Sequence, residues 1–266
     1  MRPLIACIAI VFLYTACETG TQPNRPAAAP DSVAYLNTLR QGVTAAPDSA
    51  GARLALADAL DSLGHGREAI GQLDSLIRKD SNNYDLWFKR ARFNESAHDT
   101  TAAIMSYVRA LHVYRSPDGM LSLAFLLAET RNAQSLLLCD NVREMNQGSK
   151  YAAHCDFISG VYYARTRNTA MANRFLDRCI NDDYTYIQAY FEKGYLQYDA
   201  GRYPAALEIF RTAASVSNTN PDVYYWQAKC YEAMHDARNA IASYRRSLSL
   251  DKNLVEAAAG LKRLGQ

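Results

Sequence analysis

The chain has 266 residues, a length that allows one large domain or two small ones. Hydrophobic residues make up 49% and charged residues 21%, a balance that excludes a chain disordered throughout. Lys and Arg number 29 against 27 Asp and Glu, and the formal charge of +2 gives no indication of a nucleic-acid partner.

The first segment of the chain has the pattern of an export signal. Met1-Arg2 precedes an unbroken apolar run, Leu4 to Tyr14, which is too short to span a bilayer but fits a signal-peptide core. Together with the following Thr15-Ala16-Cys17, this segment resembles a bacterial lipoprotein signal. The resemblance implies that residues 1–16 are removed and that Cys17 is lipidated. An ordinary secretory signal, with Cys17 incidental, is the alternative.

Residues 17–31 form the expected anchor and tether. Residues 18–30 contain three prolines, no aromatic residue and no apolar period, which is typical of a linker. Acyl chains on Cys17 would hold the protein at a membrane. Glu18 is not the Asp that resembles an inner-membrane retention signal, so we expect the outer membrane of a bacterial cell envelope, with the protein facing the periplasm.

A repeated spacing organises the rest of the chain. Ala69 and Ala103 are 34 residues apart, and so are Ala206 and Ala240, each near the start of an apolar-periodic segment. A frame of this length, with one extra residue in its third unit, divides the sequence into six repeats: 50–83, 84–117, 118–152, 153–186, 187–220 and 221–254. Position numbers below count from the first residue of each repeat.

Three positions hold residues of matching size in five of the six repeats. The eighth is small, as Ala57, Ala91, Gly160, Gly194 and Ala228. The twentieth is also small, as Ala69, Ala103, Ala172, Ala206 and Ala240. The twenty-fourth is bulky, as Leu73, Tyr107, Leu176, Phe210 and Tyr244. Over about residues 50 to 264 this pattern resembles the tetratricopeptide repeat family.

The resemblance implies an all-α, right-handed superhelical solenoid of about six helix-turn-helix repeats. We expect residues 32–49 to add an N-terminal capping helix and residues 255–266 a C-terminal one, because an open stack needs covered ends. The third repeat departs from the pattern, with Phe125 at the small eighth position and Leu137 at the twentieth. This predicts a wider, irregular repeat whose extra residue lies in the loop near Gly148.

The sequence contains none of the common signatures of catalysis or cofactor binding. It has no His-Glu-x-x-His, no phosphate-binding glycine loop, no Cys-x-x-Cys and no Gly-x-Ser-x-Gly. Its five histidines are scattered, without a second His or Cys at metal-ligand spacing. We therefore predict no catalytic residues, no metal, no cofactor and no enzymatic activity.

Two cysteines of the fourth repeat allow two interpretations. Cys155 near the start of the first predicted helix and Cys179 near the end of the second would lie at similar heights in an antiparallel hairpin. Export from the cytoplasm would permit a disulfide between them. The other interpretation treats Cys179 as a small apolar residue that faces the next repeat.

The concave face is the place where the family resemblance puts a binding site. In tetratricopeptide stacks the first helix of each repeat lines the groove, chiefly through positions two, five, nine, twelve and thirteen. The candidate groove residues selected from these positions are Phe88, Arg92, Phe157, Phe191, Tyr195, Tyr198, Tyr225 and Lys229. Rows of exposed aromatic residues usually mark a binding surface. Alternatively, some of these rings pack between neighbouring first helices.

Two functions fit this reading of the sequence. The first is a lipid-anchored scaffold that binds a protein or peptide segment in its groove and serves in cell-envelope assembly or maintenance. The second is a glycan-binding accessory lipoprotein in nutrient uptake, since Tyr and Phe faces also stack on sugar rings. Similar nutrient-capture lipoproteins carry long insertions between repeats. The regular 34-residue spacing leaves no room for such insertions, which favours the scaffold.

Overall fold

A computed structural model describes residues 32–145 and 148–266. These residues form fourteen α-helices and no strand, which confirms the all-α prediction for the described part of the chain. The expected signal peptide, Cys17 and the tether up to residue 31 lie outside the described residues.

The chain divides into two compact units, an N-terminal unit that ends at Gly119 and a C-terminal unit that begins at Met120. The N-terminal unit contains α1 (Ser32–Ala45), α2 (Ala50–Ser62), α3 (Gly66–Lys79), α4 (Tyr84–Ser96) and α5 (Thr100–Val113). Helix α6 (Pro117–Glu129) starts at the end of this unit and runs into the next. The C-terminal unit continues with α7 (Gln134–Glu144), α8 (Ser149–Arg165), α9 (Thr169–Asp182), α10 (Ile187–Asp199), α11 (Tyr203–Val216), α12 (Pro221–Ala233), α13 (Ala237–Leu250) and α14 (Val255–Arg263).

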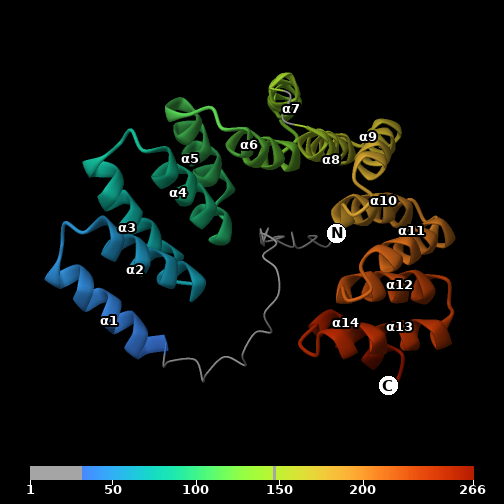
Figure 1. Cartoon of the computed structure of the whole chain (residues 1–266). Helices are drawn as coiled ribbons and strands as arrows, with labels where there is room; N and C mark the ends of the chain where they lie inside the picture. Colours follow the sequence, from blue (N-terminus) through green and yellow to red (C-terminus); the bar gives the residue numbers. More distant parts are fainter. Residues whose placement is uncertain (1–31, 146–147) are drawn as a thin grey trace. The chain divides into compact units, whose positions relative to one another are not determined.

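Consecutive helices pair as hairpins within each unit (Figure 1). Helices α2 and α3 form one pair and α4 and α5 another, while α8 and α9, α10 and α11, and α12 and α13 pair in the C-terminal unit. Helix α1 packs on α2 at one end, and α14 packs on α13 at the other. The two terminal helices therefore cover apolar surface that the outermost hairpins would otherwise expose.

The small and bulky positions found in the sequence are the contacts that hold each hairpin together. All five small residues at position 20 and all five bulky residues at position 24 are fully buried. Gly194 shows how tight the contact is, since a Cβ added there would lie 2.3 Å from Cζ of Phe210. A small residue at position eight thus lets the bulky residue of the partner helix fill the space between the helix axes.

The turns inside the hairpins share one backbone conformation. A residue with positive φ follows the first helix of every repeat, at Gly64, His98, Arg131, Arg167, Gly201 and His235. It is the fifteenth residue of its repeat except at Arg131, which is the fourteenth residue of the shifted third repeat. Only two of these residues are glycine, so the other four hold a conformation that costs L-residues roughly 1–2 kcal/mol. Side-chain caps follow the turn, as where Asp99 accepts the backbone N–H of Ala102 at 2.9 Å.

The buried positions of the third repeat are shifted in register relative to the predicted frame. Helix α6 begins at Pro117, one residue before the predicted boundary, and Ala124 rather than Phe125 is fully buried. In α7 the buried residues are Ser135, Cys139 and Val142, whereas Leu137 is 63% exposed.

A tight turn explains this shift. The backbone N–H of Ser135 donates to the carbonyl of Asn132, three residues earlier, and the N–H of Leu136 donates to that of Ala133 in the same way. Such i→i−3 bonds wind the chain more tightly than an α-helix, and the positive-φ residue Arg131 comes one residue earlier than in the other repeats, so the buried residues of α7 also come earlier. Helix α8 begins at Ser149, so residues 149–152 before Ala153 are helical, and the non-helical Gly148 precedes them.

All four cysteines in the described residues are free and buried. The Cys155 thiol donates to the backbone carbonyl of Cys139 at 3.4 Å, and no Cys155–Cys179 disulfide is formed. Cys179 is fully buried at the repeat position that Ala110 and Ala213 occupy elsewhere, and burial raises the pKa of its thiol. In the structure it therefore serves as a small apolar residue.

Candidate functional site

Two of the predicted groove residues belong to the core instead. Phe157 is 2% exposed and Phe191 is 8% exposed. The ring centroid of Phe157 lies 6.1 Å from that of Phe125 and 5.0 Å from that of Tyr186, and Phe191 lies 6.0 Å from Phe210. The prediction that these two rings line a groove is wrong, because they pack between neighbouring helices.

The other three rings predicted in the C-terminal unit come together on its first helices. Tyr195 and Tyr198 on α10 and Tyr225 on α12 are each partly exposed, and Trp226 lies among them. The Trp226 ring centroid is 4.6 Å from Tyr195, 5.5 Å from Tyr198 and 5.6 Å from Tyr225. We call Tyr195, Tyr198, Tyr225 and Trp226 the aromatic cluster.

The fully buried ring of Phe210 packs against two members of this cluster. It stacks on Trp226, with centroids 5.8 Å apart and an interplanar angle of 20°, and lies 6.1 Å from Tyr195. Phe210 comes from α11, the second helix of the fifth repeat, so the cluster is held by both helices of one hairpin and by the first helix of the next. Aromatic contacts of this kind add about 0.5–1.5 kcal/mol per pair beyond area burial.

The tyrosines of the cluster carry no charge at neutral pH. Burial raises the pKa of Tyr198 to about 12, and burial also raises the pKa of Tyr195 and of Tyr225. Their hydroxyls are therefore neutral groups that can both donate and accept hydrogen bonds beside exposed ring surface. This combination of apolar area and hydrogen-bonding capacity is what makes Tyr frequent in binding surfaces.

A cation and a restrained carboxylate border the cluster on α12. Lys229 lies one helical turn after Tyr225 and makes no ion pair within the described residues. Glu232 accepts Nε and Nη2 of Arg263 at 3.0 and 3.1 Å and the Tyr244 hydroxyl at 2.5 Å. The hydrogen bonds from Arg263 lower the pKa of Glu232, so this carboxylate stays ionised. Its oxygens are already engaged by Arg263 and Tyr244. Lys229 is thus the cation available to a ligand.

An ion-pair network fixes the first helices of the C-terminal unit. Arg165 on α8 donates to Glu129 on α6, with both distances 2.8 Å, and to Glu192 on α10, with both distances 2.9 Å. Both carboxylates raise the pKa of Arg165. Bidentate pairs of this kind restrict relative helix movement, so we assign the network a positioning role next to the cluster.

The remaining two predicted residues lie on α4 of the N-terminal unit. Phe88 is partly buried between Tyr84 and Tyr107, with ring centroids 5.5 and 5.4 Å away. Arg92 is exposed. The structure therefore brings together Tyr195, Tyr198, Tyr225 and Lys229. It adds Trp226, which was not predicted, because position six is not among the usual groove positions of the family. The only signal in the sequence was a second large ring directly after Tyr225.

Residues 54–119 and 191–254 match a family model described as tetratricopeptide repeat. The chain has the tetratricopeptide repeat fold. Proteins with this fold generally mediate protein–protein interactions, and the model matches α10 to α13, which carry the aromatic cluster. No curated protein matches the chain.

Solved structures share this fold at low sequence identity. A tetratricopeptide repeat protein from Parabacteroides merdae has a TM-score of 0.71 and 15% identity, over 89% of this chain and 93% of that one. PilW, a widely conserved type IV pilus biogenesis factor, has a TM-score of 0.62 and 18% identity, over 80% and 98% of the two chains. Yeast Tom70 has a TM-score of 0.57 and 12% identity, over 88% and 58%.

Proposed function

We propose that the protein is a scaffold that binds a segment of another protein on the aromatic cluster. The observation that carries this proposal is the cluster itself, in which three partly exposed Tyr rings lie around Trp226 and the buried ring of Phe210 packs against Trp226 and Tyr195. Tyr and Trp are the residues that most often dominate binding energy at protein interfaces. Lys229, one turn after Tyr225, offers a cation that is unpaired among the described residues to a carboxylate or carbonyl group of that segment.

The finer proposal is that Cys17 anchors this scaffold by lipid to a bacterial envelope membrane, with the repeats facing the periplasm. The lipoprotein-like segment before Cys17 supports it. No helix in the described residues is long and apolar enough to cross a membrane. We propose a role in the assembly or maintenance of the cell envelope.

Removing the lipidation site tests the anchor. Cys17→Ser is expected to move the protein from the membrane fraction to the soluble periplasmic fraction, because several acyl chains on one residue are what hold it. Fractionation followed by immunoblotting measures the change, and metabolic labelling with a fatty-acid analogue reports lipidation directly. Retention of the unlabelled variant in salt-washed membranes would contradict a lipid anchor.

Truncating the cluster tests the binding surface. Tyr198→Ala combined with Tyr225→Ala is expected to reduce recovery of a protein partner from solubilised envelope, because contacts with two exposed rings are lost. Tyr224→Ala is the matched control, since its hydroxyl donates to the Asn218 carbonyl and its ring lies under Arg246, outside the cluster.

Unchanged recovery with the double variant would contradict the proposal. The same proteins applied to a glycan array examine the second candidate function, because neutral tyrosine rings also stack on sugars. If the double variant loses oligosaccharide binding while its recovery of protein partners is unchanged, the protein is a glycan-binding protein and not a scaffold.

A further inference from the structure

The outer face of α5 differs from the outer faces of the other second helices. Met105 is the twenty-second residue of the second repeat. The four other repeats that keep the regular 34-residue frame have Gly71, Arg174, Glu208 and Ala242 at this position. At position 25, which holds Val108, they have Asp74, Asp177, Arg211 and Arg245. Met105 is 64% exposed and Val108 is 42% exposed. One helix therefore presents large apolar side chains where the other four have polar or small ones.

The exposed residues of α5 form a continuous stripe. Met105, Val108, Arg109 and His112 follow one another at spacings of three, one and three residues, so they share one face of the helix. We call these four residues the α5 stripe. Exposed apolar side chains at such a spacing match the ridges of a second helix packed alongside.

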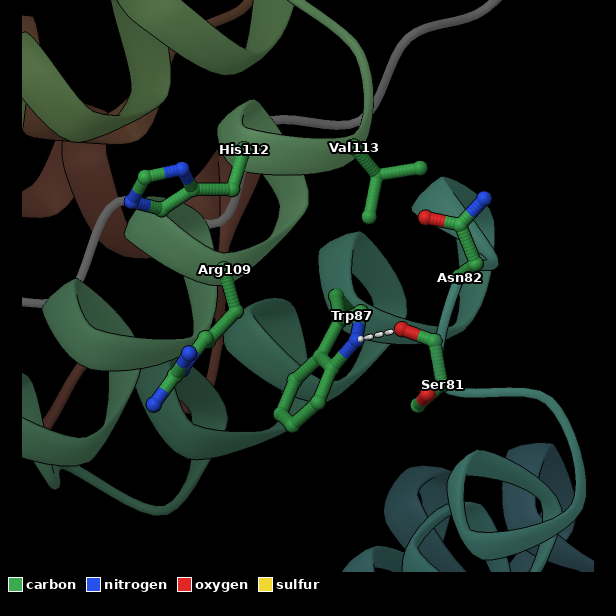
Figure 2. A pocket seen from close by; sticks show the side chains of 6 residues that line it. All are labelled: Ser81, Asn82, Trp87, Arg109, His112 and Val113. Carbon is green, nitrogen blue, oxygen red and sulfur yellow. Dashed lines mark hydrogen bonds between the residues drawn. The ribbon is translucent and has the colours of Figure 1, made fainter.

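A cleft of about 410 Å³ opens beside the stripe within the N-terminal unit. Figure 2 shows Arg109 and His112 on one side of it and Ser81 and Asn82 on the other, with the Trp87 ring between them. The Trp87 indole N–H donates to the Ser81 carbonyl at 3.0 Å, which holds the ring against the α3–α4 loop. The cleft can therefore take one apolar side chain onto a fixed aromatic surface.

One side of the cleft carries a cation, Arg109, that has no charged partner among the described residues. Neither Arg109 nor His112 forms a hydrogen bond or ion pair with any described residue. By contrast, Arg90, whose guanidinium lies 5.9 Å from the Trp87 ring centroid, is paired with Asp74 at 2.7 Å. A guanidinium beside an apolar stripe favours a partner that carries a carboxylate next to its own apolar residues.

We propose that the α5 stripe and the adjacent cleft form a second binding surface, which takes an acidic amphipathic helix of a partner protein. The apolar side chains of that helix pack on Met105 and Val108, and one of them enters the cleft over Trp87. A Glu or Asp one turn away pairs with Arg109. This surface lies on the N-terminal unit, whereas the aromatic cluster lies on the C-terminal unit, so the two are built from different residues.

Selection from a helical peptide library displayed on phage tests the proposal. The library is selected on the purified protein and depleted on the variant that combines Met105→Glu with Arg109→Glu. The peptides expected to remain carry apolar residues at i and i+4 with Glu or Asp in the next turn. Their affinity, measured by fluorescence anisotropy, is expected to fall about tenfold or more on Met105→Glu or Arg109→Glu. A peptide with Lys in place of its acidic residue should regain binding to Arg109→Glu.

Ala242→Glu is the matched control, because it places the same charge at the same position of the sixth repeat. It should leave peptide affinity unchanged, and thermal melts should show that every variant is folded, since all the changed side chains are exposed. Three results would overturn the proposal. They are failure to enrich any peptide, enriched peptides without carboxylates, and vesicles of anionic lipid that bind the protein through these residues in place of peptides.

Discussion

Replacing Phe191 by alanine is expected to lower the free energy of unfolding by about 3–5 kcal/mol, the usual cost of removing a buried phenyl ring. The ring contacts Phe210 and Tyr195 and belongs to a cluster of buried side chains, so its removal leaves a cavity in a packed core. Chemical denaturation of the variant and the wild type measures the difference. Phe88→Ala provides a comparison in the N-terminal unit, where the ring is only partly buried and the expected loss is smaller.

An unchanged denaturation midpoint for Phe191→Ala would contradict the core assignment. It would return this ring to the groove, as the position-five pattern suggested. The free energy of a repeat protein is a sum of repeat and interface terms, so both transitions should be recorded if the two units unfold separately.

Adding a single methyl group at Gly194 is the second change with a large expected effect. The new Cβ in Gly194→Ala would lie 2.3 Å from Cζ and 2.6 Å from Cε1 of Phe210, whose ring is fully buried. We expect a net loss of about 1–3 kcal/mol in unfolding free energy from overpacking. This loss should appear even though alanine is favoured over glycine in a helix by about 1 kcal/mol.

Gly71→Ala is the matched control for this prediction. Gly71 is inside α3 and exposed, and nothing lies within 4 Å of an added Cβ, so this substitution should raise stability. Phe210→Leu combined with Gly194→Ala should recover part of the loss, because the first repeat already pairs Ala57 with Leu73. If the Gly194→Ala variant is as stable as the Gly71→Ala variant, the contact between Gly194 and Phe210 is not tight.

The sequence predicted the hairpins well because five of the six repeats carry small and bulky residues at the same three positions. Ala206 and Ala240 are small for one reason, the approach of two helices, and a single sequence therefore contains its own comparison. The third repeat could not be placed in this way. The turn that precedes Ser135 depends on backbone hydrogen bonds that leave no mark on residue spacing.

Only part of the candidate site could be predicted, because the sequence does not show which way a ring at position five faces. Position five of a first helix can face either the groove or the neighbouring helix, and packing decides between them. Phe191 has Phe210 within reach and is buried, whereas Tyr225 lies beside Trp226 and Tyr244 and keeps part of its ring exposed. Composition and periodicity cannot distinguish these cases, because both positions hold a large aromatic residue in an amphipathic helix.

The affinity of a recovered partner for the aromatic cluster is the most direct test of the central claim. Isothermal titration calorimetry would compare the wild type, the variant that combines Tyr198→Ala with Tyr225→Ala, and the Tyr224→Ala control. Loss of hot-spot rings typically costs about 2 kcal/mol or more, which is roughly a 30-fold rise in Kd. We predict that rise for the double variant alone, with the control unchanged. Equal Kd values for all three proteins would contradict the claim that this cluster is the binding surface.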